Sequence, residues 1–128
     1  DLGKALLSIP AVKGIEFGSG FAAAEKFGSE QNDPLVVKNG KISFTKNDAG
    51  GLLGGISTGE DLVIRIAVKP SSSISKEQST VTKGKKPVKI EISGRHDPCI
   101  VPRVIPVAES MAAIVLLDHL MRARAASS

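Results

Sequence analysis

The chain has 128 residues, of which 41% are hydrophobic and 23% charged, and this composition indicates one globular domain and excludes a disordered chain. Aromatic residues make up only 3% and there is one cysteine, which argues against a reader of single-stranded nucleic acid and excludes an internal disulfide framework. The net charge of +4 is uneven, because residues 1–64 carry −2 and residues 65–128 carry +6, so the basic half predicts an anionic partner.

The predicted elements form a short helix, a strand, a helical segment, several strands and a long helix. The first half is expected to hold a helix over 2–8, a strand over 12–17, a helix-prone segment over 21–27, a loop over 28–34 and a hairpin of 35–37 and 42–44 around Asn39-Gly40. The second half is expected to hold a glycine-rich loop over 48–59, strands over 62–68, 78–82 and 88–92, and a helix over 105–124. This order predicts an α+β fold with mainly antiparallel pairing.

The long helix is apolar on every side from Met111 to Leu117, which predicts burial all round, in a large core or against another subunit. About five short strands make roughly one sheet and cover one face, so we expect further protein around this helix. Its uninterrupted apolar run is shorter than about 18 residues, from which we expect no membrane span. The first residue is Asp1 and not Met, from which we expect a processed chain or part of a longer one.

Three segments could carry chemistry. The glycine-rich run Asn47–Gly55 could expose backbone N–H groups as an anion nest, with Leu52-Leu53 anchoring it to a core, or it could be a flexible surface loop. Lys69–Ser73 combines a lysine, a proline and three hydroxyls that could bind a phosphate, or it could be an ordinary exit from a strand.

The third segment is Arg95–Cys99, with Arg103 nearby. An arginine can bind a carboxylate or phosphate, and a neighbouring Asp or His can transfer protons. The alternative is a helix-entry loop in which Asp97 and the prolines set the start of the helix. One His, one Asp and one Cys lack a fourth ligand at suitable spacing, so we expect no metal site.

Four ordered motifs resemble those of the chorismate synthase family. They are 11–18 (AVKGIEFG), 47–57 (NDAGGLLGGIS), 69–74 (KPSSSI) and 94–103 (GRHDPCIVPR) running into 104–121. The resemblance covers nearly the whole chain and implies antiparallel sheets packed on buried helices, as part of a β-α-β sandwich. It identifies residues 1–128 as the C-terminal portion of one longer domain. The N-terminal portion, with the two catalytic histidines of the family, is absent, so we expect the chain alone to be inactive.

The resemblance implies an FMN-dependent lyase of the shikimate pathway, which leads to the aromatic amino acids. Such enzymes bind reduced FMN and convert 5-enolpyruvylshikimate 3-phosphate to chorismate by an anti-1,4-elimination of phosphate. The resemblance also implies NADPH in the associated redox chemistry, a homotetramer and a cytoplasmic location, with neither nucleic acid nor a membrane as partner. A non-catalytic basic binding or assembly module is the alternative that the composition leaves open.

Carried over from the family, the site residues fall into two groups. Asp97 resembles the acid that handles a proton near the flavin, and Arg95 reaches both flavin and substrate. The expected cofactor-binding residues are Ala11, Gly54, Lys69, Pro70, Ser71, Ser72, Ser73 and Arg95. Pro10 stands where many members of the family have Asn, so a side-chain contact is not expected at that position.

Overall fold

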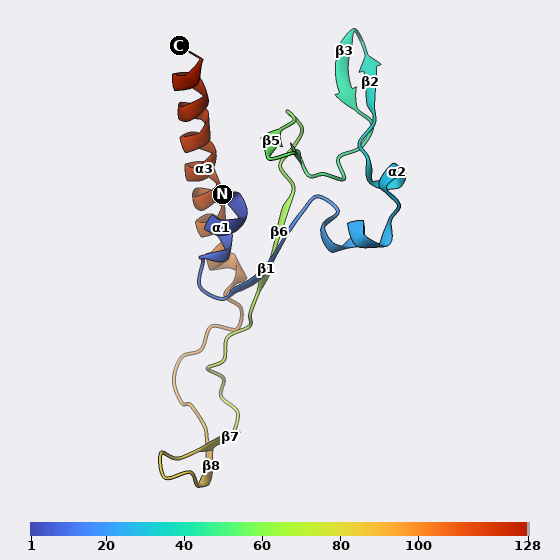
Figure 1. Ribbon diagram of the computed structural model, residues 1–128. Coiled ribbons are helices and arrows are strands. Elements are labelled where there is room, and N and C mark those ends of the chain that lie inside the picture. The colour runs from blue at the N-terminus through green and yellow to red at the C-terminus, as the bar shows by residue number, and fades with distance from the viewer. Residues whose placement is uncertain (128) are drawn as a thin grey trace. The chain divides into compact units, whose positions relative to one another are not determined.

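The computed structural model describes residues 1–127 and divides into two units, Asp1–Ala67 and a second that begins at Val68. The elements before residue 78 are α1 (Leu2–Leu7), β1 (Val12–Phe17), the 3₁₀ helix η1 (Gly20–Glu25), α2 (Gly28–Gln31), β2 (Leu35–Lys38), β3 (Lys41–Phe44), β4 (Leu52–Leu53), β5 (Ile56–Ser57) and β6 (Ile64–Val68). They are followed by β7 (Gln78–Val81), β8 (Pro87–Ile90) and α3 (Val101–Ala126) (Figure 1). Strands pair two by two, as β1-β6, β2-β3, β4-β5 and β7-β8, which confirms the α+β class.

A small apolar cluster lies at the start of the first unit. Leu2 and Leu6, four residues apart on one face of α1, are buried, as is Val12 on β1. The chain turns between α1 and β1 at Pro10 and Ala11, where the N–H of Val12 donates to the carbonyl of Ile9 at 3.1 Å. Proline at the second position and a positive φ of 71° at Ala11 are typical of a type II turn.

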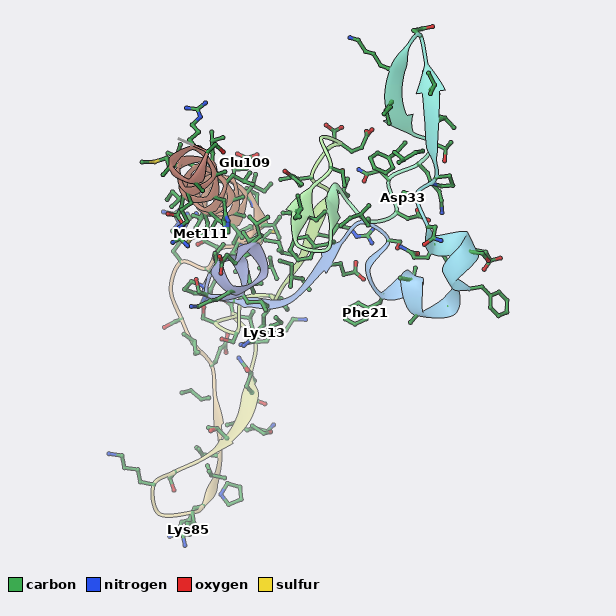
Figure 2. All side chains as sticks on the ribbon, turned by 45° about the horizontal axis from the view of Figure 1, so that its top comes forward. Lys13, Phe21, Asp33, Lys85, Glu109 and Met111 are labelled. Carbon is green, nitrogen blue, oxygen red and sulfur yellow. The ribbon has the colours of Figure 1, made fainter. Side chains whose placement is uncertain are left out.

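The rest of the first unit is held by polar contacts. The Asp33 carboxylate accepts hydrogen bonds from the backbone N–H groups of Asp48 and Ala49 at 2.8 and 2.9 Å (Figure 2 labels Asp33). The Asp48 carboxylate in turn lies 2.7 Å from Lys46 Nζ and 3.0 Å from Lys26 Nζ. The hydrogen bonds from Lys46 and then Lys26 lower the pKa of Asp48 below its ordinary value. These contacts join segments that bury little apolar surface.

The short elements match the predictions where the signal is local. Asn39 and Gly40 have φ values of 52° and 75°, as a type I′ turn requires, and Leu35 pairs with Phe44 in the expected hairpin. The loop expected over residues 28–34 begins instead with the one-turn helix α2. Its first turn is stabilised by Glu30, whose carboxylate accepts a hydrogen bond from the N–H of Phe27 at 2.9 Å.

The second unit begins with a segment that leads to the β7–β8 hairpin. Gln78 lies opposite Ile90 and Val81 opposite Pro87, so the open end of the hairpin is at the Gln78–Ile90 pair. The turn at the other end carries Lys85 in the left-handed region, with φ 60°. Its side chain lies at the tip of the hairpin (Figure 2).

The helix α3 differs from its prediction in length and in burial. It begins at Val101, four residues before the predicted start, because Pro102 occupies the first turn, where no backbone N–H needs a partner. Within the described residues of this chain most of it is exposed and Val104 is its one buried residue. The burial that its composition predicts is therefore not found among the described residues.

The length of α3 does not exclude a membrane span, although the short uninterrupted apolar run led us to expect none. The helix has 26 residues, and its most apolar 18-residue window reaches a mean hydropathy of 1.6 with 6% of the window buried. By length and composition alone it could cross a membrane. A core helix of a larger protein passes the same test when its covering layers are missing.

Candidate functional site

Two candidate segments of the second unit are connected to the same end of one hairpin. Lys69–Ser73 precedes β7 and Arg95–Asp97 follows β8. Because Gln78 pairs with Ile90, the chain enters β7 and leaves β8 at the same end, with five residues from Ser73 to Gln78 and five from Ile90 to Arg95. Figure 1 shows the two connecting segments running together away from the hairpin. The antiparallel pairing is therefore what brings a serine-rich segment and an Arg-His-Asp segment into one region.

The Lys69–Ser73 segment presents a cation and hydroxyls to solvent. Lys69 follows the last residue of β6 and is exposed, and no acidic side chain among residues 1–127 forms an ion pair with it. The hydroxyls of Ser71 and Ser73 lie 3.2 Å apart, so both sit on one side of the loop. An unpaired lysine and two neighbouring hydroxyls in one short segment are donors that suit a phosphate or another oxyanion.

Asp97 is held by a side chain and does not cap the helix. Its Oδ2 accepts a hydrogen bond from the guanidinium of Arg103, on the first turn of α3, at 2.7 Å. The N-cap of α3 is Ile100, and no side-chain capping bond is present there, so Asp97 does not cap the helix, while Pro102 does lie in its first turn. Next to it, His96 Nε2 lies 3.0 Å from the carbonyl oxygen of Ile92, and since a carbonyl only accepts, this nitrogen donates. The neighbouring Arg95 is exposed, and the structure of residues 1–127 gives it no ion pair.

The other two candidates, Ala11 and Gly54, lie in the first unit. The positive φ of Ala11 costs an alanine roughly 1–2 kcal/mol, and such strained residues are common at functional sites. Gly54, with φ 58°, lies in the turn of the β4–β5 hairpin, where an added Cβ would meet no atom within 4 Å. Its backbone is therefore open to the approach of another molecule.

The anion nest predicted for Asn47–Gly55 is already filled at its N-terminal end. The carboxylate of Asp33 takes the N–H groups of Asp48 and Ala49, and the N–H of Gly51 donates to Asn47 Oδ1 at 2.7 Å. Sequence reasoning missed Asp33, whose only signal is a carboxylate in the preceding polar loop. The Leu52-Leu53 anchor is half right, because Leu52 is half-buried while Leu53, its neighbour on a strand, points the other way and is 47% exposed.

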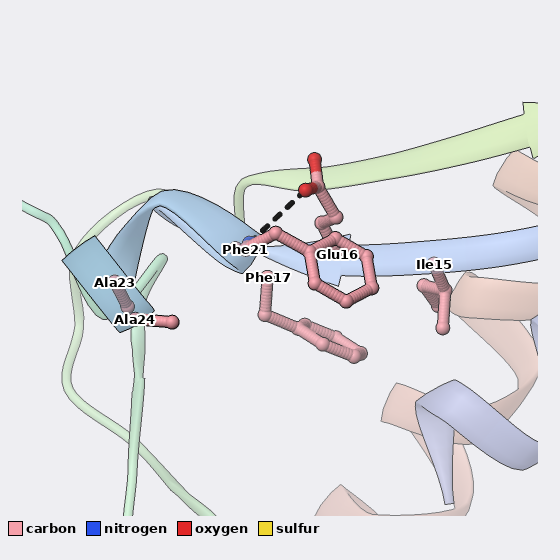
Figure 3. A pocket seen from close by; sticks show the side chains of 7 residues that line it. Ile15, Glu16, Phe17, Phe21, Ala23 and Ala24 are labelled. Atoms are coloured by element: carbon pink, nitrogen blue, oxygen red, sulfur yellow. Dashed lines mark hydrogen bonds between the residues drawn. The ribbon is translucent and has the colours of Figure 1, made fainter.

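An open apolar hollow in the first unit contains none of the predicted site residues (Figure 3). It is lined by Ile15, Glu16, Phe17, Gly20, Phe21, Ala23 and Ala24. Its carboxylate is fully engaged, because Glu16 accepts from the N–H of Phe21 at 3.0 Å and from Arg65 Nε at 2.9 Å. The Phe21 N–H, together with Arg65, lowers the pKa of Glu16. The hollow therefore offers apolar surface without a free charge.

Comparison with known proteins gives one family throughout. The sequence profile of the family described as chorismate synthase matches residues 1–121. A chorismate synthase of Chloroflexus aggregans is 54% identical over 127 residues, which is 98% of this chain and 35% of the relative. Chorismate synthases of Archaeoglobus fulgidus and Methanosarcina barkeri are 58% and 59% identical, over 94% and 95% of this chain and 34% of each relative.

A solved structure, "Crystal Structure of Chorismate Synthase", superposes with a TM-score of 0.71 at 34% sequence identity. The match covers 94% of this chain and 29% of the solved chain. The chain thus spans about a third of the length of the relatives that it matches.

Proposed function

The chain belongs to the chorismate synthase family, and from this premise we propose that it forms the C-terminal portion of a chorismate synthase domain. The complete protein would be a lyase that eliminates phosphate from 5-enolpyruvylshikimate 3-phosphate to give chorismate, with reduced FMN as cofactor. One observation supports this proposal for these residues. Lys69–Ser73 and Arg95–Asp97 are both connected to the same end of the β7–β8 hairpin.

The donor set of this region fits FMN. Lys69 and the hydroxyls of Ser71, Ser72 and Ser73 can donate to phosphate or carbonyl oxygens, and Pro70 restricts the backbone between them. Charge-assisted hydrogen bonds of this kind are each worth roughly 1.5–3 kcal/mol. Ala11 and Gly54 would add backbone contacts. When bound, reduced FMN would supply an electron to the substrate and regain it, so that the flavin would not be consumed.

Two side chains of the Arg95–Asp97 segment take separate roles in this proposal. Arg95, without an ion-pair partner in the described residues, would bind the anionic groups of flavin and substrate. Asp97 would hold or release a proton at Oδ1, because its Oδ2 is bound by Arg103. Both residues would act on ligands that are strongly anionic, which agrees with the net charge of +6 over residues 65–128.

The test compares two lysines in the complete protein. Lys69→Ala should weaken FMN binding about tenfold or more, because it removes a charged donor, while turnover at saturating FMN changes less. Lys76→Ala is the matched control, since Lys76 is an exposed lysine of the same connecting segment without a predicted contact. Equal FMN affinity in both variants would contradict the assignment. Failure of the parent protein to bind FMN would favour a basic assembly module.

Further properties belong to the same proposal. The exposed apolar surface of α3 supports the expectation that the 128 residues alone are inactive and need the rest of the domain around them. The family also leads us to propose a homotetramer, NADPH in the associated redox chemistry and a cytoplasmic location. Sedimentation equilibrium of the complete protein tests the first of these, with a monomer as the contradicting result.

A further inference from the structure

The contact between Asp97 and Arg103 joins an irregular segment to a long helix. Arg103 is the third residue of α3, and its N–H donates to the carbonyl of Ile100 at 3.0 Å, so its backbone is fixed by the helix. Asp97 lies in the stretch without regular structure before the helix. The guanidinium therefore ties a carboxylate on a loop to a rigid element, at 2.7 Å between Nη1 and Oδ2.

This ion pair is so exposed that it should add little to the folding free energy. The side chain of Arg103 is 66% exposed and that of Asp97 31%. Exposed pairs of this kind contribute little to folding, because water screens the charges and two side chains lose freedom. A single contact on one carboxylate oxygen does, however, fix the orientation of the Asp97 carboxylate group. Within residues 1–127, Oδ1 of Asp97 accepts no hydrogen bond, so it stays available to another group.

We propose that Arg103 is a positioning residue, which orients the Asp97 carboxylate so that Oδ1 faces the reacting groups. This inference rests on the proposed function, in which Asp97 handles a proton. Arg103 itself touches neither cofactor nor substrate in this account. Its effect on the reaction therefore passes entirely through Asp97.

A double-mutant cycle in the complete, FMN-loaded protein tests this. Arg103→Ala should lower kcat about 10- to 100-fold, as expected when a reacting group is misplaced, with KM and FMN affinity within threefold of the parent. Arg103→Lys should recover most of the rate, because an ammonium group can still bind Oδ2. In an Asp97→Asn background, Arg103→Ala should cost no more than about threefold, since there is no longer a carboxylate to orient. Arg122→Ala is the control, because Arg122 forms a similar exposed pair with Asp118 at 2.9 Å on the same helix.

Each other outcome overturns the inference. Turnover of Arg103→Ala within threefold of the parent, or losses that multiply in the double variant, would show that Arg103 does not act through Asp97. Weaker FMN binding or a raised KM at unchanged kcat would make Arg103 a ligand contact. If Arg103→Ala does not fold, Arg103→Gln is judged by the same criteria. Turnover retained by Asp97→Asn alone marks failure of the proposed function, whereas loss in Asp97→Asn with none in Arg103→Ala marks failure of this inference only.

Discussion

The cations on either side of the β7–β8 hairpin differ from three paired cations of the first unit. In the first, Lys26 and Lys46 bind Asp48, and Arg65 binds Glu16, so these cations hold the chain to itself. In the second, Lys69 and Arg95, which precede and follow the hairpin, have no ion-pair partner in the described residues. The difference separates cations that are paired with a carboxylate of the chain from cations that remain free for an anionic ligand.

The comparison predicts that changes to the paired or closely packed residues of the first unit lower stability, while changes at the base of the hairpin lower binding or rate. The largest effect should come from Asp97→Asn in the complete protein. Asn has nearly the same size but cannot exchange the proton, so turnover should fall about 10²- to 10⁴-fold. FMN affinity and melting temperature should stay close to the parent, because Asp97 does not cap α3. Turnover within threefold of the parent would leave Asp97 as a structural residue.

Gly18→Ala should be the most damaging change in the first unit. With φ 56°, an added Cβ would lie 2.0 Å from the carbonyl oxygen of Asp48, so the strain and the clash together should cost about 3 kcal/mol of unfolding free energy. Gly40→Ala, at φ 75° in open space, should cost only about 1–2 kcal/mol. Chemical denaturation of the complete protein measures both, and equal losses would refute the close packing at Gly18.

Gly54→Ala then separates a fold role from a cofactor role. Its open surroundings predict the same modest loss of stability as Gly40→Ala, about 1–2 kcal/mol. If the backbone at Gly54 lies against FMN, the added methyl group should weaken FMN binding, and Gly40→Ala should not. Fluorescence titration with FMN measures both variants. Unchanged affinity in Gly54→Ala would remove Gly54 from the site.

Asp33→Ala should cost about 2 kcal/mol of unfolding free energy. The change leaves the N–H groups of Asp48 and Ala49 without the carboxylate that now accepts both hydrogen bonds. Catalytic rate should not change once the protein is folded. A loss below about 0.5 kcal/mol in urea denaturation would mean that water replaces the carboxylate without penalty.

The smallest effect concerns pH. The pKa of Asp48 is lowered from an ordinary value of 3.8 by Lys46 and Lys26, so the carboxylate stabilises the folded state above that value. This contribution should be lost as the pH falls below 3.8 and through the native pKa. Asp48→Asn should flatten the acid limb of the melting-temperature profile, while Asn in place of the exposed Asp61 should not. Parallel profiles for all three proteins would contradict the role of Asp48.

Local patterns in the sequence were enough to predict much of the secondary structure. The β1 strand and the Asn39-Gly40 hairpin follow from alternation and turn chemistry within a few residues. The start of α3 was missed because proline disfavours helix interiors but is accepted in the first turn, so Pro102 looked like a boundary. The filled nest was missed because Asp33 lies 15 residues from its partner Asp48, and no local pattern reports such a contact.

The candidate site also has a part that the sequence predicts and a part that only the structure gives. Its residues were named from family motifs, and the hairpin register adds that two of these motifs leave the same end of one element. The Arg103–Asp97 contact could be suspected from sequence only as proximity, since an irregular segment between two residues leaves their side-chain directions open.

In the proposed function, the Lys69–Ser73 segment and the Arg95–Asp97 segment bind one anionic cofactor. A crystal structure of the complete protein with FMN tests it most directly, through the distances from FMN to Lys69 Nζ and to the serine hydroxyls. Polar atoms of FMN should lie within about 3.2 Å of Lys69 and of at least one of Ser71, Ser72 and Ser73. FMN bound elsewhere, with Lys69 paired to a carboxylate of the protein, would contradict it.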